Sequence, residues 1–369
     1  MPWRAAITGR ASLCAGPAAP GGLLQACRAA AAALPPLASP PALPGQAVRG
    51  RQLEGEVPLR PDDAAERVLG RHGRWLLQVA EAAHARAGLA ALPREQVGLC
   101  VALGMVDPDP EDLAPAVLAS REGGEGHAGD GPVSLARFHA GGFRAMHPLW
   151  PLSMLGNVAA GQVAIALDLR GDNTVLASDG LSGVRVLLEA RRALQAGAAQ
   201  AVLAAAAAEP LAPASLARLS LAGEAGAWRE PGEGAAALVL EQPAAAAARA
   251  APVAGWLVGA ATRAARPGEA AGPLLARVAA EALAEAGWEA RDVGLLLLAG
   301  RARDADVAGL CAQAERLRPA ACVGDLLGAA PLLASALALE AGVPRALVVH
   351  AEGERAAGAL ALEVAACGS

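Results

Sequence analysis

Short apolar segments alternate with amphipathic segments along the chain. Residues 174–178 and 201–208 carry no charged side chain and have the length of buried strands. From Ser182 onward, Val184, Leu187, Leu188 and Leu194 instead recur at helical spacing on one face. Strands that are apolar on both faces and alternate with helices are typical of a sheet covered on both sides. The pattern therefore predicts an α/β protein.

The same order of segments occurs twice. Residues 176–209 align with the stretch that begins at Ala320, and their helices match without a gap at an offset of 145 residues. Each copy runs from a strand through an Asp/Gly turn and a helix that ends in glycine to a buried strand, and another strand begins at Gly234 or Gly358. A repeat of the same segments at a fixed offset indicates that the chain consists of two duplicated halves.

The match extends upstream, where a helix followed by a buried strand occurs at 76–104 and again at 274–300. We therefore expect two β-α-β-α-β-β halves, residues 1–250 and 251–369. The first half carries a Gly- and Pro-rich insertion at 107–151.

Composition and charge narrow the class of protein. The 369 residues are 54% hydrophobic and 18% charged, which is typical of a well-packed globular chain. Lysine and tyrosine are absent, and arginine supplies all 31 basic residues; no lysine can therefore form a Schiff base. A net charge of −5 with 2% aromatic residues argues against a nucleic-acid surface.

Other composition signals point to a cytoplasmic protein without a metal or cofactor. The longest apolar runs are far shorter than the ~20 residues of a membrane span, and the N-terminal stretch lacks the apolar core of a signal peptide. The six cysteines form no CxxC pair, so neither a disulfide framework nor a zinc site is expected. His84 and His350 are interpreted as structural histidines.

Three motifs carry a specific resemblance. They are "HPLWPLSMLGNVAAGQVAIALDLRGDNTVLASDGLSG" (147–183), "PGEGAAALVLE" (231–241) and "GDLLGAAPLLASALAL" (324–339). The last two are similar to "GEGAGVLVLE" and "GHLLGAAG" of the β-ketoacyl-acyl-carrier-protein synthases, which have the thiolase fold. The resemblance covers nearly the whole chain, and it implies a five-layer αβαβα sandwich.

The resemblance also locates the catalytic positions of the family. Ketosynthases use a cysteine nucleophile and two histidines, and these positions fall here on Gly180, Ala299 and Asp325. A family lysine falls on Ala320, and the family's "GFGGTN" loop is replaced by "EGERAAG". Gly180 and Asp325 are 145 residues apart, which makes them equivalent positions of the two halves.

A chain without these side chains is not expected to catalyse condensation by itself. It resembles chain-length factors, and this implies a non-catalytic subunit that pairs with an active ketosynthase and meets acyl-carrier protein in fatty acid, polyketide or polyene biosynthesis. Two alternatives stay open. One is an acyltransferase with relocated chemistry that uses Ser182 and Asp179, and the other is a scaffold that binds carrier protein.

The resemblance further implies where a partner and an acyl tunnel would lie. In the family, the strand that corresponds to residues 174–178 pairs with its counterpart across a dimer axis. The insertion and the residues after it concentrate large apolar side chains beside that strand, although ordinary packing of an irregular loop is an alternative. The expected interface or tunnel residues are Phe138, Phe143, Met146, Trp150, Met154 and Asn157.

Overall fold

The computed structural model describes residues 3–17, 21–29, 34, 50–53, 69–103, 110–122, 131–177, 180–221, 230–353 and 355–366. Within these ranges the chain forms ten strands that belong to one mixed sheet. The first five strands are β1 (Ala5–Cys14), β2 (Val97–Leu103), β3 (Asn173–Ala177), β4 (Ala201–Ala208) and β5 (Gly234–Glu241). The others are β6 (Gly255–Ala264), β7 (Leu295–Gly300), β8 (Glu315–Leu317), β9 (Arg345–Glu352) and β10 (Ala356–Val364).

The strand order is symmetrical about its centre. It runs β3-β2-β4-β5-β1-β6-β10-β9-β7-β8, so each strand of the first half has a counterpart in the second. In both halves the two outer pairings are parallel and the two inner pairings are antiparallel. This order matches the repeat that the apolar pattern predicts.

The two halves of the sheet are joined by hydrogen bonds at β1 and β6. The pairing is short and covers Ala5–Ile7 against Gly255–Leu257. Strand pairing therefore continues from one half into the other, which the periodicity of the sequence did not indicate.

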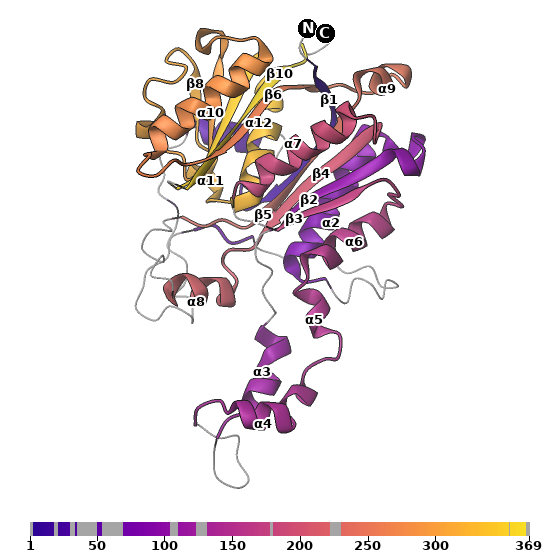
Figure 1. Ribbon diagram of the computed structural model, residues 1–369, viewed down its shortest axis with the longest axis vertical. Helices are drawn as coiled ribbons and strands as arrows, with labels where there is room; N and C mark the ends of the chain where they lie inside the picture. The colour runs from indigo at the N-terminus through magenta and orange to yellow at the C-terminus, as the bar shows by residue number, and fades with distance from the viewer. Residues whose placement is uncertain are drawn as a thin grey trace.

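The described part of the chain contains twelve helices (Figure 1). The first six are α1 (Gly22–Ala29), α2 (Arg71–Ala87), α3 (Pro110–Ala119), α4 (Leu135–Ala140), α5 (Trp150–Ser153) and α6 (Gly156–Ala166). The others are α7 (Ser182–Gln195), α8 (Pro213–Leu221), α9 (Pro243–Ala248), α10 (Ala271–Ala286), α11 (Ala320–Val323) and α12 (Ala330–Ala341).

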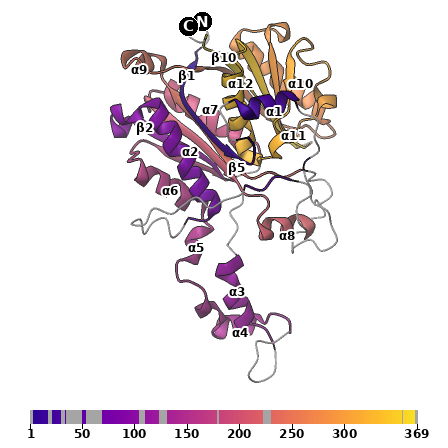
Figure 2. The ribbon, with the colours of Figure 1, turned by 180° about the vertical axis from the view of Figure 1, so that it is seen from behind.

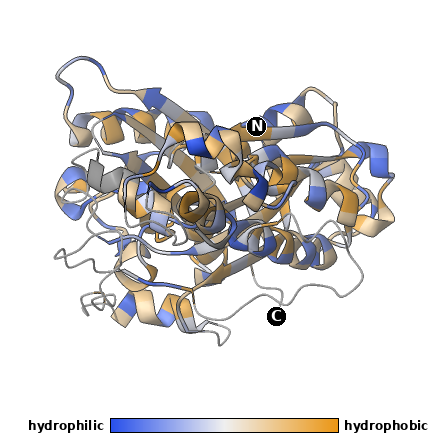
Figure 3. Cartoon of the chain, turned by 90° about the horizontal axis from the view of Figure 1, so that it is seen from below, coloured by the Kyte–Doolittle hydropathy of each residue, from blue (hydrophilic) through white to orange (hydrophobic). Residues whose placement is uncertain are grey.

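Three apolar cores define the layers. The central core contains α7 and α12 together with side chains from strands of both halves. A second core packs α2 and α6 on the first half of the sheet, and a third packs α10 on the second half. The order is therefore helix, sheet, helix, sheet, helix, which confirms the expected αβαβα sandwich. Figure 3 shows helices that carry both hydrophobic and hydrophilic residues.

The formula expected for each half counts four strands, although a strand was also expected before each Asp/Gly turn. The one expected at 174–178 forms as β3, but the one expected from Ala320 was wrong, because residues 320–323 form helix α11 and the edge strand β8 ends before them. Each half has five strands, because β3 and β8 lie at the two edges of the sheet. Strand β8 has three residues, of which Glu315 and Arg316 are charged. So short a polar segment at an edge has no apolar periodicity to reveal it.

The insertion forms an arm. We use this name for residues 110–122 and 131–155, which include α3, α4 and α5. Figures 1 and 2 show α3 and α4 well away from the sheets, at the lower end of the molecule. Helix α6 follows the arm and returns to the body, where Val163 and Ala160 pack in the core under α2.

Candidate functional site

The two turns that the resemblance singles out lie together. Gly180 precedes α7, while Asp325 precedes a single 3-10 turn (Leu327–Ala329) and α12. A β-carbon added to Gly180 would lie 3.8 Å from the carbonyl carbon of Leu327. One added to Gly183 would overlap the carbonyl oxygen of Gly328. The starts of the two central helices are therefore in close contact, and this contact requires glycine at position 183.

A histidine lies at this meeting point, although neither turn contains one. His350 is in β9, where it pairs in register with Ala299 of β7 and Gly358 of β10. Its Nε2 lies 2.7 Å from the place of a β-carbon on Gly180. The side chain is buried, and neither ring nitrogen has a hydrogen-bond partner among the residues that the structure describes. Burial lowers the pKa of His350 from 6.5 to about 4, so the imidazole is neutral near pH 7.

Sequence reasoning interpreted His350 as an ordinary structural histidine and missed its position. No motif surrounds it, since its neighbours in β9 are alanine and valine. A histidine within an otherwise apolar strand was the one available signal. That signal does not say which residue the ring faces.

Asp325 shapes the second turn. Its carboxylate accepts a hydrogen bond of 3.0 Å from the backbone N–H of Leu327. Leu327 has φ +47°, a left-handed conformation that is uncommon for leucine. Burial raises the pKa of the Asp325 carboxyl, and the Leu327 N–H and the charges of Arg301 and Arg318 oppose this rise. Asp325 therefore holds a strained turn in the place where the family has a histidine.

The other expected positions are also buried. Ala299 lies near the end of β7, and Ala320 begins α11. Ser182, the serine considered for relocated chemistry, is completely buried at the start of α7. Asp179 lies outside the described residues. The structure thus places Gly180, Ala299 and Asp325 around the contact between the central helices and supplies His350 from β9.

The backbone of the "PGEG" motif (231–234) passes close to the backbone of the Asp325 turn. Gly232 donates a hydrogen bond of 3.0 Å to the carbonyl oxygen of Asp325, and the Asp325 N–H donates one of 2.7 Å to the carbonyl oxygen of Glu230. A β-carbon on Gly232 would overlap the carbonyl oxygen of Val323. This close approach explains the glycine.

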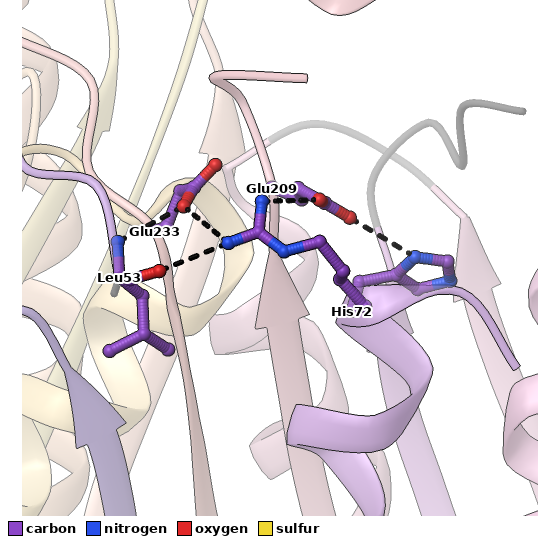
Figure 4. Close-up of polar contacts among 5 residues, drawn as sticks. Leu53, His72, Glu209 and Glu233 are labelled. Atoms are coloured by element: carbon purple, nitrogen blue, oxygen red, sulfur yellow. Dashed lines mark hydrogen bonds and ion pairs between the residues drawn. The ribbon is translucent and has the colours of Figure 1, made fainter. Parts of the chain in front are cut away.

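Glu233 anchors the same motif in a polar cluster with Leu53, Arg71, His72 and Glu209 (Figure 4). Its Oε2 accepts from the Leu53 N–H at 3.0 Å and lies 3.4 Å from an Arg71 nitrogen. Arg71 also contacts Glu209 at 3.1 Å, and Glu209 lies 3.6 Å from His72. Burial and the charge of Glu209 raise the pKa of Glu233 to about 7, although Arg71 and the Leu53 N–H oppose the rise.

The expected interface or tunnel residues are partly or fully exposed. Phe143 and Met154 are 45% and 37% exposed, Asn157 is exposed, and Phe138, Met146 and Trp150 are half-buried. None of the six belongs to the three apolar cores. The interface or tunnel role and the local packing of the arm both stay predictions for these residues.

Large apolar side chains are exposed in one region of the described chain. The large apolar side chains that are at least 37% exposed all lie on the arm or on α6. They are Val117, Leu118, Val133, Leu135, Phe143, Leu149, Met154, Leu155 and Ile165. Strand β3, which follows α6, pairs only with β2 and forms an edge of the described sheet.

The described residues contain neither a membrane-spanning helix nor a metal-binding cluster. No helix among them is both long and apolar enough to cross a bilayer. Nor do three or more His, Cys, Asp or Glu side chains gather there in a way that could hold a metal ion.

Comparison with known proteins defines the class. Two five-stranded halves around paired central helices are the architecture of condensing enzymes with the thiolase fold. A family model described as "Beta-ketoacyl synthase, N-terminal domain" matches residues 60–246, about half of the chain. The chain belongs to the β-ketoacyl synthase family. Among curated proteins, no sequence matches it.

Solved structures share the fold over the whole chain. One is a type II polyketide synthase acyl-carrier protein in complex with its ketosynthase bound to the hexaketide, with a TM-score of 0.76, 15% identity, and coverage of 99% of this chain and 100% of that one. The ishigamide ketosynthase/chain length factor has a TM-score of 0.72 and 22% identity, with 98% and 99% coverage. A β-ketoacyl synthase from Burkholderia phymatum has a TM-score of 0.73 and 17% identity, with 98% and 100% coverage.

Proposed function

We propose that this chain is a non-catalytic ketosynthase-like subunit that pairs with a catalytically complete β-ketoacyl synthase and meets acyl-carrier protein. The observation that carries the proposal is at the nucleophile position, where Gly180 has no side chain to acylate and the His350 ring lies against it. Ala299 and Asp325 at the two family histidine positions support the same conclusion. The products would be those of fatty acid, polyketide or polyene biosynthesis.

The exposed apolar surface supports pairing. Single exposed apolar residues are normal on soluble proteins, but a concentration of them in one region marks an interaction surface. The arm, α6 and the edge strand β3 adjoin along the chain, and β3 has an uncharged sequence, "NTVLA". An uncovered apolar edge favours aggregation unless a partner pairs with it.

The structural neighbours agree with this proposal without establishing it. They include a ketosynthase in complex with a carrier protein and a ketosynthase/chain length factor. At 15% and 22% identity they share the fold with this chain. The proposal of a ketosynthase partner therefore rests on the residues at the site and on the surface.

Co-expression tests the proposal. The chain is co-expressed with a ketosynthase that retains the cysteine and both histidines of the family, and the masses of the purified species are measured by size-exclusion chromatography with light scattering. We expect a 1:1 complex. Leu135→Asp, at a position that is 73% exposed on the arm, should weaken it if the arm contacts the partner.

Gln78→Asp is the matched control, because it also adds a carboxylate to an exposed helix position but lies on α2. It should leave the complex intact. The proposal fails if the chain stays alone, or forms only a homodimer, in the presence of that ketosynthase.

A further inference from the structure

The ring of His350 lies close to two glycines, one before a central helix and one at the end of a strand. Gly180 precedes α7, and Gly300 ends β7. A β-carbon on Gly180 would lie 2.7 Å from Nε2 and 3.1 Å from Cε1 of His350. A β-carbon on Gly300 would overlap Cε1 and lie 2.8 Å from Nδ1. Favourable contacts between heavy atoms lie near ~3.5–4.0 Å, so the ring excludes a side chain at either position.

The backbone gives no separate reason for glycine at position 180. Several glycines in the described chain have a positive φ, and Gly300 is one of them with φ +61°. Gly180 is not. Its φ is one that other residues adopt without strain, and the nearest obstacle to a side chain there is the imidazole.

The ring cannot easily move away. His350 pairs within the sheet with both β7 and β10, and its side chain is 1% exposed. Close-packed interiors leave few voids into which a buried ring can turn. The backbone of Gly300 and Ala351 lies on its other side, since a β-carbon on Gly300 would also be 2.8 Å from the Ala351 oxygen.

Polar contacts do not explain why a histidine is there. Both ring nitrogens are buried without a hydrogen-bond partner in the described part of the chain, and a buried polar group in that state is destabilising. The ring is therefore held by its packing against the two glycines and the neighbouring strands. What the imidazole contributes is its volume at the start of α7.

We propose that the imidazole of His350 occupies the space of the family's nucleophile side chain, so that Gly180 and His350 form a matched pair and a cysteine restored at 180 alone cannot rebuild an acyl-accepting site. This inference does not depend on the partner proposed above. A second residue, His350 on β9, would thus prevent a single substitution at position 180 from restoring the nucleophile.

A double-mutant cycle tests the proposal on the full chain. Thermal unfolding is measured for Gly180→Ala, His350→Ala and the double variant. We expect Gly180→Ala to lower the melting temperature by several degrees, and we expect most of that loss to disappear when His350→Ala is also present. If Gly180→Ala does not fold at all, recovery of a folded double variant gives the same support.

Two other glycines serve as matched controls. Gly183→Ala should lower the melting temperature whether or not His350 is present, because its obstacle is the Gly328 carbonyl oxygen. Gly161→Ala, in α6, should cause no loss, because nothing lies within 4 Å of its β-carbon. These controls separate a specific clash with His350 from a general intolerance of alanine.

The proposal is overturned if Gly180→Ala keeps the wild-type melting temperature, or if its loss is the same with and without His350. It is also overturned if the double variant fails to fold while His350→Ala folds. Each of these results is distinct from failure of the proposed function, which concerns assembly with a ketosynthase and is read from the mass of the complex.

Discussion

Glu241, the last residue of β5, forms a buried ion pair with Arg249, which follows α9. The Nε of Arg249 lies 2.9 Å from Oε2 of Glu241, and the hydroxyl of Thr8 donates to the same carboxylate. Arg249 also donates a hydrogen bond of 2.6 Å to the carbonyl oxygen of Ala87 at the end of α2. The pair therefore ties β1, β5 and α2 together at the end of the first half.

Arg249→Ala should destabilise the protein strongly, because it leaves the completely buried Glu241 carboxylate without its counter-charge. Breaking a buried pair costs about 3–5 kcal/mol. Chemical denaturation measures the loss. Arg291→Ala is the control, since Arg291 and its partner Glu289 are 74% and 66% exposed, and exposed pairs contribute about 0–1 kcal/mol. Equal losses for the two variants would contradict the prediction.

Glu233 should make the protein less stable as the pH rises towards neutrality. Its pKa is raised from 4.5 to about 7 in the folded protein, so between these values the folded chain keeps a proton that the unfolded chain has released. The free energy of unfolding therefore falls with rising pH in this window, by at most about 1.4 kcal/mol per pH unit. Glu233→Gln should remove this contribution, and denaturation curves from pH 4.5 to 7.5 measure it.

His350 should make the free energy of unfolding change with pH in the opposite direction to Glu233, at lower pH. Its pKa falls from 6.5 to about 4 on folding, so between these values the unfolded chain binds a proton that the folded chain does not. The free energy of unfolding therefore rises with pH from 4 to 6.5. His350→Leu should flatten that part of the pH profile, because leucine fills a similar volume without a titrating group. A profile that is unchanged in the variant would show that His350 does not contribute to it.

The chain alone should not become acylated. Position 180 is glycine and Ser182 is completely buried, so neither offers an accessible nucleophile before α7. Intact-mass spectrometry after incubation with an acyl-loaded carrier protein checks this, and an active ketosynthase serves as the positive control. A stable acyl adduct on Ser182 would favour the enzyme with relocated chemistry.

Phe143→Ala should alter the length of the product made by the assembled complex more than it alters folding. Phe143 is 45% exposed on the arm, so its truncation creates no core cavity. Phe138→Ala is the companion variant, at a half-buried position of α4. Product masses and melting temperatures are compared for both. A lowered melting temperature with an unchanged product would assign these rings to packing of the arm.

Much of the fold was predictable because its signals are local. Strands such as β4, with eight buried apolar residues, show their burial in their own sequence. The apolar positions at helical spacing in α7 likewise show from the sequence alone which side of that helix is buried. The duplication was visible because equivalent turns, helix ends and strands recur in the same order. For the same reason the family resemblance located Gly180, Ala299 and Asp325 from the motifs alone.

Other features depend on residues that are far apart in the chain. The pairing of β1 with β6 arises because the two halves meet edge to edge, and neither strand has a sequence signal for that neighbour. Strand β8 is too short and polar to show a period. The exposure of the arm could not be read from its composition, since the same phenylalanine and leucine residues would suit a buried loop.

By itself the sequence determined the α/β class and the duplicated order, and it predicted the loss of the family's reactive side chains, because each of these is recorded in residue type and spacing along the chain. Only the tertiary structure decided that the imidazole of His350 fills the space beside Gly180. The register of β9 between β7 and β10 and the packing of α7 set that contact. A contact of this kind leaves no periodic trace, since it depends on where separate elements meet in space.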